Sequence, residues 1–388
     1  MKGSQGTARA LNRRSVLRLL RTERGLSRAN LAHRIGLSRA AITAVVGEMI
    51  EEGLLAEGEA SAGAQGRRPI PLEICYRSRL AVGIRITSQE LECVLTDLST
   101  EVIASTREPL EQSDPDGIIN AVVSVLARLS SIAKTAGSRI SGVGIGVPGA
   151  VDILTGSVIR SFRLGWSDVP LAAMLAKRIR LPVWVDDDTL AFALNQQLFG
   201  VAKNYENALV LAVGEGISVG SIIAGRVRHG SFHRAGKIGH LKRDPDGPRC
   251  ECGRSGCLQS LYSYTALKRK WAEIAPKAKP SSLLDAANNE DPAALTLLRE
   301  AGAAIGIEMA TCCGLLDPGV LIVGGEATAF GEPFLNPLIE SLRSRFQFEG
   351  CQIVVDWEAQ SWSRGAAALA TQSLFDFEAT SGTVPKEI

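Results

Sequence analysis

The sequence has 388 residues, of which 45% are hydrophobic and 22% are charged. This composition is typical of a globular protein, and a chain of this length is expected to form two or three domains. It contains no run of 18 or more apolar residues, so we expect no membrane span and no membrane partner. The first ten residues are polar and form no apolar signal core, which predicts a cytoplasmic protein. In that reducing compartment the eight cysteines are expected to be thiols or metal ligands rather than disulfides.

Charge is distributed unevenly along the chain. The net charge is only +2, but residues 1–72 contain 12 Lys and Arg against 6 Asp and Glu, and so carry +6. The remainder of the chain carries −4. A basic head on a slightly acidic body indicates that the head meets a polyanion such as nucleic acid. A solvated basic helix would have the same charge, so charge alone does not decide between the two.

The first 52 residues predict three helices. Apolar residues recur with helical spacing over residues 12–24, and Gly25 ends that helix. Ser27 occupies the N-cap position of a short second helix, a turn follows at Gly36, and Ser38 caps a third helix that ends near residue 52. The buried face of the third helix is expected to contain Ile42, Val45, Met49 and Ile50. Helix, glycine-containing turn and helix in this order predict a helix-turn-helix.

In a helix-turn-helix, the N-terminal residues of the second helix meet base edges in the major groove. Here those residues are Ser38, Arg39, Ala40 and Thr43. Arg39 is suited to guanine, while Ala40 and the methyl group of Thr43 suit thymine methyl groups. Arg28 and Arg34 are better placed for phosphates, which position a protein without specifying sequence.

A hairpin wing is expected after the third helix. Residues 54–55 begin a strand, residues 56–66 are small, polar and rich in glycine, and residues 71–74 return as a second strand. Arg67 and Arg68 lie near the tip, where arginines commonly enter the minor groove. The alternative is a three-helix packing module that makes no contact with DNA.

From residue 80 the pattern becomes that of an α/β protein. It predicts strands at 80–87, 90–98, 101–108, 140–147 and 182–186, with helices at 116–136 and 188–199. The pattern then restarts with a hairpin of strands 207–213 and 217–224, followed by a helix at 292–316 and strands at 319–323 and 352–356. Two such runs predict two lobes with a ligand cleft between them.

Glycine-rich motifs mark the ends of several of these elements. They are GVGIGVPG at 142–149, GW at 165–166, LPV at 181–183, DDD at 186–188, AGKIGH at 235–240, CECGRSGC at 250–257 and GG at 324–325. In order and spacing these motifs resemble the ROK family of repressors, open reading frames and sugar kinases. The resemblance covers residues 12–375 and includes the helix-turn-helix of the repressor branch.

The resemblance implies an α/β fold in which a winged helix-turn-helix precedes a two-lobed, actin-like (ribonuclease-H-like) domain of the sugar-kinase type. We therefore expect a DNA-binding domain at 1–75, a first lobe at 76–188 and a second lobe at 189–362 that contains a metal site. A C-terminal helix at about 363–388 is expected to pack back on the first lobe.

Four soft ligands predict the metal site. His240, Cys250, Cys252 and Cys257 have the spacing H-x9-C-x-C-x4-C, which describes a closed tetrahedral zinc site with no water position. The family resemblance implies the same structural zinc. Buried thiols without metal are the alternative, and His229 and His233 are less favoured candidate ligands.

Kinase chemistry is expected to have been lost. Kinases of the family have a first phosphate loop of the DxGxT type, but the matching stretch, residues 85–89, reads RITSQ. The second loop, GTGxG in the family, has a carboxylate at Glu215. Asp188 holds the position of the catalytic base, but a base without phosphate loops does not make a kinase. We therefore expect no catalytic residues, with Asp188 a vestige.

The resemblance also implies a ligand set. The family's sugar-binding positions correspond to Gly149, Phe162, Asp187, Asp188, Lys237, His240 and Gln259. Lys237 replaces a glutamate, so a group that accepts hydrogen bonds from hydroxyls has become a cation that only donates. One hypothesis is an acidic ligand neutralised by Lys237 and Arg163. The other is that Lys237 pairs with Asp187 and the pocket has drifted or no longer binds sugar.

Taken together, these patterns predict a repressor of carbohydrate genes that binds operator DNA as a homodimer or homotetramer and responds to a sugar or sugar acid. Two alternatives remain open. One is a sugar kinase with a DNA-binding head. The other is a regulator that has a degenerate pocket and is controlled by a protein partner.

Overall fold

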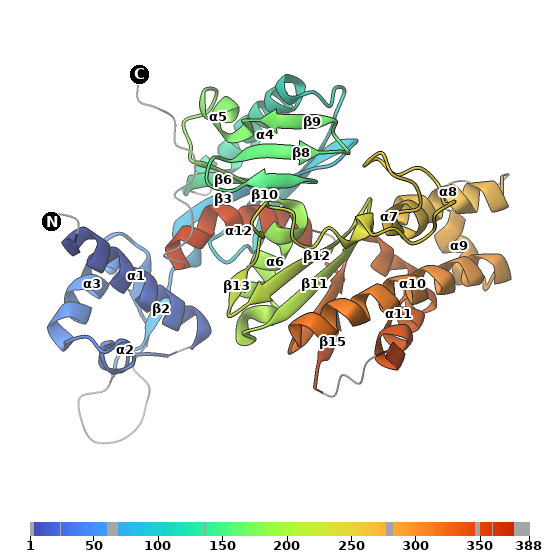
Figure 1. The fold of residues 1–388 in the computed structure, drawn as a ribbon. Helices are drawn as coiled ribbons and strands as arrows, with labels where there is room; N and C mark the ends of the chain where they lie inside the picture. Colours follow the sequence, from blue (N-terminus) through green and yellow to red (C-terminus); the bar gives the residue numbers. More distant parts are fainter. Residues whose placement is uncertain are drawn as a thin grey trace.

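A small helical head and two larger lobes make up the molecule (Figure 1). The structure is a computed structural model. It describes residues 4–23, 25–59, 69–135, 137–276, 282–345, 350–358 and 360–375.

The head contains the predicted helix-turn-helix. Its helices are α1 (Ser4–Thr22), α2 (Arg28–Ile35) and α3 (Arg39–Glu51), so the first begins earlier than its apolar pattern predicts. Ser27 caps α2 in a capping box with Asn30, and the side chain of Ser38 accepts a hydrogen bond from the Ala41 amide at the start of α3. Gly36 ends α2 with φ at 75°, a conformation that glycine adopts without strain.

A two-stranded wing follows α3. Strands β1 (Leu55–Glu57) and β2 (Leu72–Ile74) pair antiparallel, with Leu55 opposite Ile74. Leu55 and Leu72 are buried against the helices of the head. The predicted DNA contacts Arg67 and Arg68 lie outside the described residues.

The first lobe is built on a five-stranded sheet with the order β10-β6-β3-β4-β5. Its strands are β3 (Arg79–Ile86), β4 (Glu90–Thr96), β5 (Val102–Pro109), β6 (Arg139–Val147) and β10 (Val183–Asp187). The short 3-10 turn η1 (Tyr76–Ser78) links the head to β3. The first three strands form an antiparallel meander, and β6 and β10 join parallel to β3.

Helix α4 (Pro115–Thr135) covers one face of this sheet. By length and composition alone it is apolar enough to span a membrane. Its apolar side, which includes Ile118, Val122 and Leu129, is buried in the core of the lobe together with residues of β3, β4 and β6. The helix therefore has the environment of a core helix.

Three short strands that the sequence analysis did not predict form a separate small sheet. They are β7 (Ala150–Asp152), β8 (Ser157–Ser161) and β9 (Trp166–Val169), and the short helix α5 (Leu171–Ala176) follows. Strands of three to five residues carry too little alternation to be detected in a sequence. This sheet places Gly149 and the β8–β9 turn at the mouth of the cleft described below.

The second lobe repeats the same strand arrangement. Its sheet has the order β13-β12-β11-β14-β15 and consists of β11 (Ala208–Val213), β12 (Ile217–Ile223), β13 (Arg226–Val227), β14 (Val320–Gly324) and β15 (Gln352–Val355). As in the first lobe, three antiparallel strands are followed by two parallel ones. The repeat expected from the sequence is therefore confirmed.

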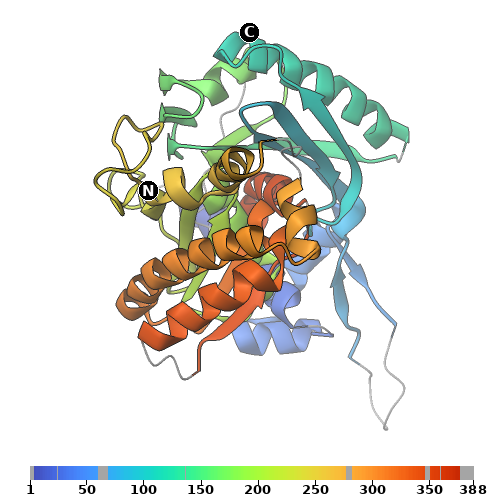
Figure 2. The ribbon, with the colours of Figure 1, turned by 90° about the vertical axis from the view of Figure 1, so that its right-hand side faces the viewer.

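The helices of the second lobe pack beside its sheet (Figure 2). They are α7 (Leu258–Tyr262), α8 (Tyr264–Ile274), α9 (Ser282–Asn288), α10 (Pro292–Leu316) and α11 (Glu332–Arg345). Helices α10 and α11 form the most extensive helix pair, and three 3-10 turns complete the lobe: η2 (Val201–Asn204), η3 (Ile238–His240) and η4 (Glu326–Phe330).

Two helices, α6 (Asp188–Leu198) and α12 (Ser361–Phe375), pack together at the junction of the two lobes. Helix α12 crosses β3 and β6 closely enough that a Cβ at Gly144 would lie 1.8 Å from the Ala366 carbonyl oxygen. Leu369 and Phe375 of α12, with Leu198 of α6, belong to the same apolar cluster as the core of the head. The two helices therefore connect the lobes with the head.

Candidate functional site

The predicted DNA-contacting end of α3 is exposed. Ser38, Arg39, Ala40 and Thr43 are all accessible to solvent. The Thr43 hydroxyl donates to the Arg39 carbonyl at 2.8 Å, so its hydrogen atom is already engaged within the helix. The guanidinium of Arg28, for which a phosphate contact is expected, forms an ion pair with Glu57 of the wing. That pair fastens the wing to the first turn of α2.

A cavity of about 780 Å³ lies between the two lobes. Six residues of the predicted ligand set line it, namely Gly149, Phe162, Asp188, Lys237, His240 and Gln259. Asp187 lies behind this lining at 2% exposure, where it caps α6 by accepting a hydrogen bond from the Leu190 amide at 3.1 Å. The end of β10 and the start of α6 therefore direct Asp187 and Asp188 to different environments.

Lys237 pairs with the buried Asp187 carboxylate. Burial raises the pKa of Asp187 to about 6, and the adjacent ammonium of Lys237 opposes that rise. The Gly149 amide also donates to this carboxylate, at 3.4 Å. Lys237, which stands where the family has a glutamate, thus has a carboxylate partner. This is the arrangement expected by the hypothesis that Lys237 pairs with Asp187.

Arg85, which the sequence analysis matches to the acid of the family's first phosphate loop, is almost fully buried and faces three carboxylates. Its guanidinium lies 2.8 Å from Glu326 and 3.2 Å from Glu92, and its Nε lies 3.8 Å from Asp188. Burial alone would lower the pKa of Arg85, but these carboxylates raise it overall. The ring of Trp362 stacks against the guanidinium with its centroid at 4.2 Å. Because Arg85 belongs to β3 and Glu326 to η4, this ion pair joins the two lobes.

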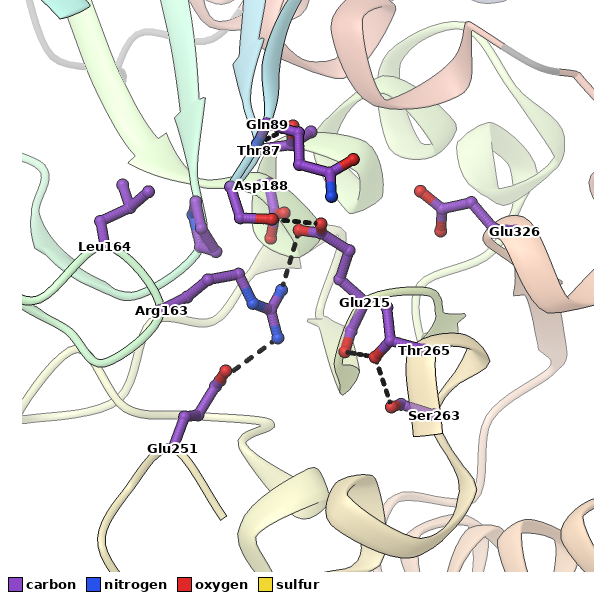
Figure 3. Close-up of polar contacts among 12 residues, drawn as sticks. Thr87, Gln89, Arg163, Leu164, Asp188, Glu215, Glu251, Ser263, Thr265 and Glu326 are labelled. Carbon is purple, nitrogen blue, oxygen red and sulfur yellow. Dashed lines mark hydrogen bonds and ion pairs between the residues drawn. The ribbon is translucent and has the colours of Figure 1, made fainter. Parts of the chain in front are cut away.

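Glu215 forms a second bridge between the lobes (Figure 3). Its carboxylate accepts a hydrogen bond from the Ser88 hydroxyl at 2.7 Å and faces Arg163 at 3.5 Å. The other side of the Arg163 guanidinium lies 3.2 Å from Glu251. Glu215 is therefore held by donors of the first lobe.

The four predicted metal ligands converge. The ligand atoms of His240, Cys250, Cys252 and Cys257 all lie within 4.8 Å of one another. The Cys252 and Cys257 sulfurs are 3.7 Å apart, and the Cys250 sulfur is 3.5 Å from His240 Nδ1. Ligands around a tetrahedral zinc with Zn–S near 2.3 Å are about 3.5–3.8 Å apart. The donor set and its spacing therefore fit zinc.

The His240 ring joins this cluster to the cleft. Its Nδ1 faces the cysteines, while the residue also lines the cavity. Phe162 packs edge-on against the ring, with centroids 5.8 Å apart. Burial lowers the pKa of His240, which favours the neutral ring that binds metal through one nitrogen and leaves the other available.

Several cavity residues were not predicted from the sequence, although their charge and position next to motifs offered a signal. They are Arg160, Arg234, Glu251, Arg254 and Trp362. Arg160 lies over the Phe162 ring at 5.2 Å, and Glu251 accepts from the Gln259 amide at 2.9 Å. Trp362, in α12, lines the same cavity as Phe162 although it lies about 200 residues later in the chain. Only the fold shows that these two residues line one cavity.

A winged helix joined to two actin-like lobes defines a class of proteins in which a DNA-binding head is built onto a sugar-kinase-like body. The profile of the ROK family matches residues 81–376, and a winged helix-turn-helix DNA-binding profile matches residues 9–56. The chain belongs to the ROK family.

Curated relatives of similar length include repressors. The xylose repressor of Caldicellulosiruptor bescii is 26% identical over 359 residues, which cover 88% of this chain and 90% of the relative. NagC of Escherichia coli, named as a DNA-binding transcriptional dual regulator, is 26% identical over 349 residues, covering 87% and 86% of the two chains.

Solved structures show the same fold. A ROK family transcriptional regulator described as a homologue of the E. coli MLC protein superposes with a TM-score of 0.82 at 23% identity, covering 95% of this chain and 97% of that one. A ROK family glucokinase from Streptomyces griseus, solved with glucose and AMPPNP, has a TM-score of 0.68 at 27% identity. It covers 76% of this chain and 99% of its own.

Proposed function

We propose that this protein is a cytoplasmic, carbohydrate-responsive transcriptional repressor that binds operator DNA as a homodimer. The observation that carries the proposal is the exposed N-terminal end of α3 on a head that shares an apolar cluster with α6 and α12 of a ROK body. The repressors among the relatives support it. A dimer is expected because one short recognition helix reads few bases and a two-fold operator matches a two-fold protein.

We infer that the ligand is a neutral, hydroxyl-rich sugar, because the two cations on which the acidic-ligand hypothesis relies are paired. Lys237 and Arg163 each contact a carboxylate, as Arg85 does, whereas Arg160, Arg234 and Arg254 line the cavity outside these pairs. Asp188 and His240 offer polar atoms to hydroxyl groups, and the partly exposed Phe162 ring offers an apolar face to a pyranose. The pairing of Lys237 with Asp187 thus weighs against the hypothesis of an acidic ligand.

The cysteine and histidine cluster is assigned a structural zinc. When bound, the metal would fix the loop of residues 240–257, which contributes His240, Glu251 and Arg254 to the cavity. Zinc would also fix the orientation of the His240 ring, so that its second nitrogen faces the ligand.

Helix α6 offers a path from the cleft to the head. Asp188 lines the cavity at its N-terminus, and the carbonyl of Leu198, its last residue, accepts a hydrogen bond from Arg21 of α1. If lobe closure moves α6, this hydrogen bond would therefore transmit the movement directly to α1.

The test is fluorescence anisotropy of the full-length protein on DNA from upstream of its own gene, at fixed salt. Neutral sugars including xylose and N-acetylglucosamine, sugar acids and sugar phosphates are then titrated. We expect specific binding that one neutral sugar shifts. A shift by sugar acids alone would overturn the neutral-ligand assignment. A flat response to every sugar would favour control by a protein partner, and absence of specific DNA binding would refute the repressor.

The second candidate is a sugar kinase with a DNA-binding head, which the likeness to a glucokinase and the retained Asp188 favour. Against it stand Arg85 and Glu215, which occupy the two phosphate-loop positions and are tied across the cleft. MgATP at 100 times a Kd would stabilise a kinase by about 2.7 kcal/mol. We expect no thermal shift with MgATP, and a clear rise in Tm would reopen the kinase assignment.

A further inference from the structure

A second cavity, of about 370 Å³, lies between the head and the second lobe. Arg14, Arg18 and Arg21 line it from α1, where their spacing of three to four residues places them on one face of the helix. Lys203 of η2 and Arg226 of β13 line the opposite side. In Figure 1 the C-terminal half of α1 extends towards β13 and α6.

The lining of this cavity is strongly basic. Of its described residues, five are Lys or Arg, and Glu206 is the single carboxylate. Arg18 and Lys203 are exposed, and among the ion pairs of the described residues neither has a carboxylate partner. Like charges therefore face each other across the junction, and their repulsion opposes the docking of α1 on the lobe.

Arg21 adds a partly buried charge to this cavity. Its guanidinium donates to the carbonyls of Leu198 and Gln197, which are neutral, and its Nε is buried without a hydrogen-bond partner. Burial, together with the nearby charge of Arg18, lowers the pKa of Arg21 to about 10. A bound anion would compensate both the lost hydration and the repulsion.

We propose that this cavity binds a phosphate-type anion, which bridges α1 of the head and the edge of the second lobe. Guanidinium and ammonium donors converging from two sides suit the several acceptor oxygens of a phosphate. Ser15 and Asn204 supply neutral donors in the same lining, whereas the Thr22 hydroxyl already donates to the Arg18 carbonyl at 3.1 Å. The volume is adequate for a phosphorylated small molecule.

The site goes beyond the carbohydrate response, because it lies at the opposite end of α6 from the sugar cleft and requires no sugar. A phosphate could come from a free small anion or from the DNA backbone. Figure 1 shows α3, the predicted DNA-reading helix, on the side of the head away from the lobes. The cavity on the lobe side therefore fits a free anion better than bound DNA.

Isothermal titration of the full-length protein with pyrophosphate, in a phosphate-free buffer and without sugar or DNA, tests this proposal. We expect saturable binding and a higher Tm than equal ionic strength of NaCl produces. The double variant Arg18→Gln with Lys203→Gln should bind at least about tenfold more weakly, since two charge-assisted contacts are lost. The matched control is Lys177→Gln with Arg178→Gln, two exposed cations of the first lobe that should leave binding unchanged.

The proposal is overturned if the wild-type protein shows no saturable binding, or if the Arg18 and Lys203 variant binds as tightly as the control. A third result would also overturn it: no pyrophosphate binding, but weaker DNA binding with a shallower salt dependence in that variant. The phosphates would then belong to the DNA backbone. None of these results depends on which sugar, if any, acts in the cleft.

Discussion

At the scale of single residues, Arg39 carries the expected sequence specificity. It is exposed at the first turn of α3, and no ion pair of the described residues engages its guanidinium. Replacing it with alanine should weaken binding to the preferred operator by about 1–3 kcal/mol and relax the choice of base at one position. Anisotropy on operator and scrambled DNA measures both effects. Arg178→Ala, on the first lobe, serves as the control, and equal losses on both DNAs would assign Arg39 to phosphate contact instead.

Cys252 is the residue through which the metal assignment is most directly tested. Its sulfur lies 3.7 Å from that of Cys257 within the four-ligand cluster. Cys252→Ala should abolish stoichiometric zinc, because three ligands hold the metal far less tightly than four. Metal analysis of the purified proteins measures this. Cys351→Ala, a cysteine outside the cluster, should retain zinc, and normal zinc content in the Cys252 variant would refute the assignment.

At the scale of elements, the packing of α12 on the first sheet depends on glycines that face it. A Cβ at Gly144 would lie 1.8 Å from the Ala366 carbonyl oxygen, and one at Gly83 would lie 2.0 Å from that of Ser363. Both neighbours are backbone atoms that cannot move without displacing the helix. Because these two glycines have no side chain, α12 can pack closely on β3 and β6. This close packing allows α12 to join the lobes and the head.

Gly144→Ala should destabilise the protein by about 1–3 kcal/mol because it overpacks this contact. Gly47→Ala is the matched control. Gly47 is in α3, and a Cβ there would meet no atom within 4 Å, so alanine should stabilise that helix by about 0.5–1 kcal/mol. Thermal denaturation measures both. An unchanged Tm for Gly144→Ala would show that α12 does not rest on the sheet as closely as described.

At the scale of the whole molecule, the lobes are joined by polar bridges across the cleft. Arg85 with Glu326, and Glu215 with Ser88 and Arg163, connect the two sheets across the cleft. Arg85 and Glu215 are also the positions at which the sequence analysis expects the phosphate loops of the family's kinases to be altered. We therefore expect the same two residues to hold the lobes together and to disfavour phosphate binding.

Communication between the cleft and the head is expected to pass through Arg21. Its guanidinium holds the C-terminal carbonyls of α6 and lies near the rings of Phe199 and Phe375, at 6.0 Å and 5.7 Å. Arg21→Met keeps the apolar contact and removes these hydrogen bonds. DNA affinity without sugar should change little, while its shift by the active sugar should shrink. Anisotropy with and without that sugar measures the ratio, and a full shift in the variant would place the coupling elsewhere.

Much of this protein follows from the sequence alone. The caps of α2 and α3, the turn at Gly36, the repeated succession of strands and helices and the four-ligand cluster depend on residues close together in the chain, and such local patterns can be recognised without a structure. Only the tertiary structure showed the contacts between residues that are far apart in the sequence. Lys237 meets Asp187 across 50 positions and Arg85 meets Glu326 across 241, and the anion cavity is formed by α1 and the second lobe together. Periodicity and spacing do not encode such pairings, because they arise only when separate elements pack.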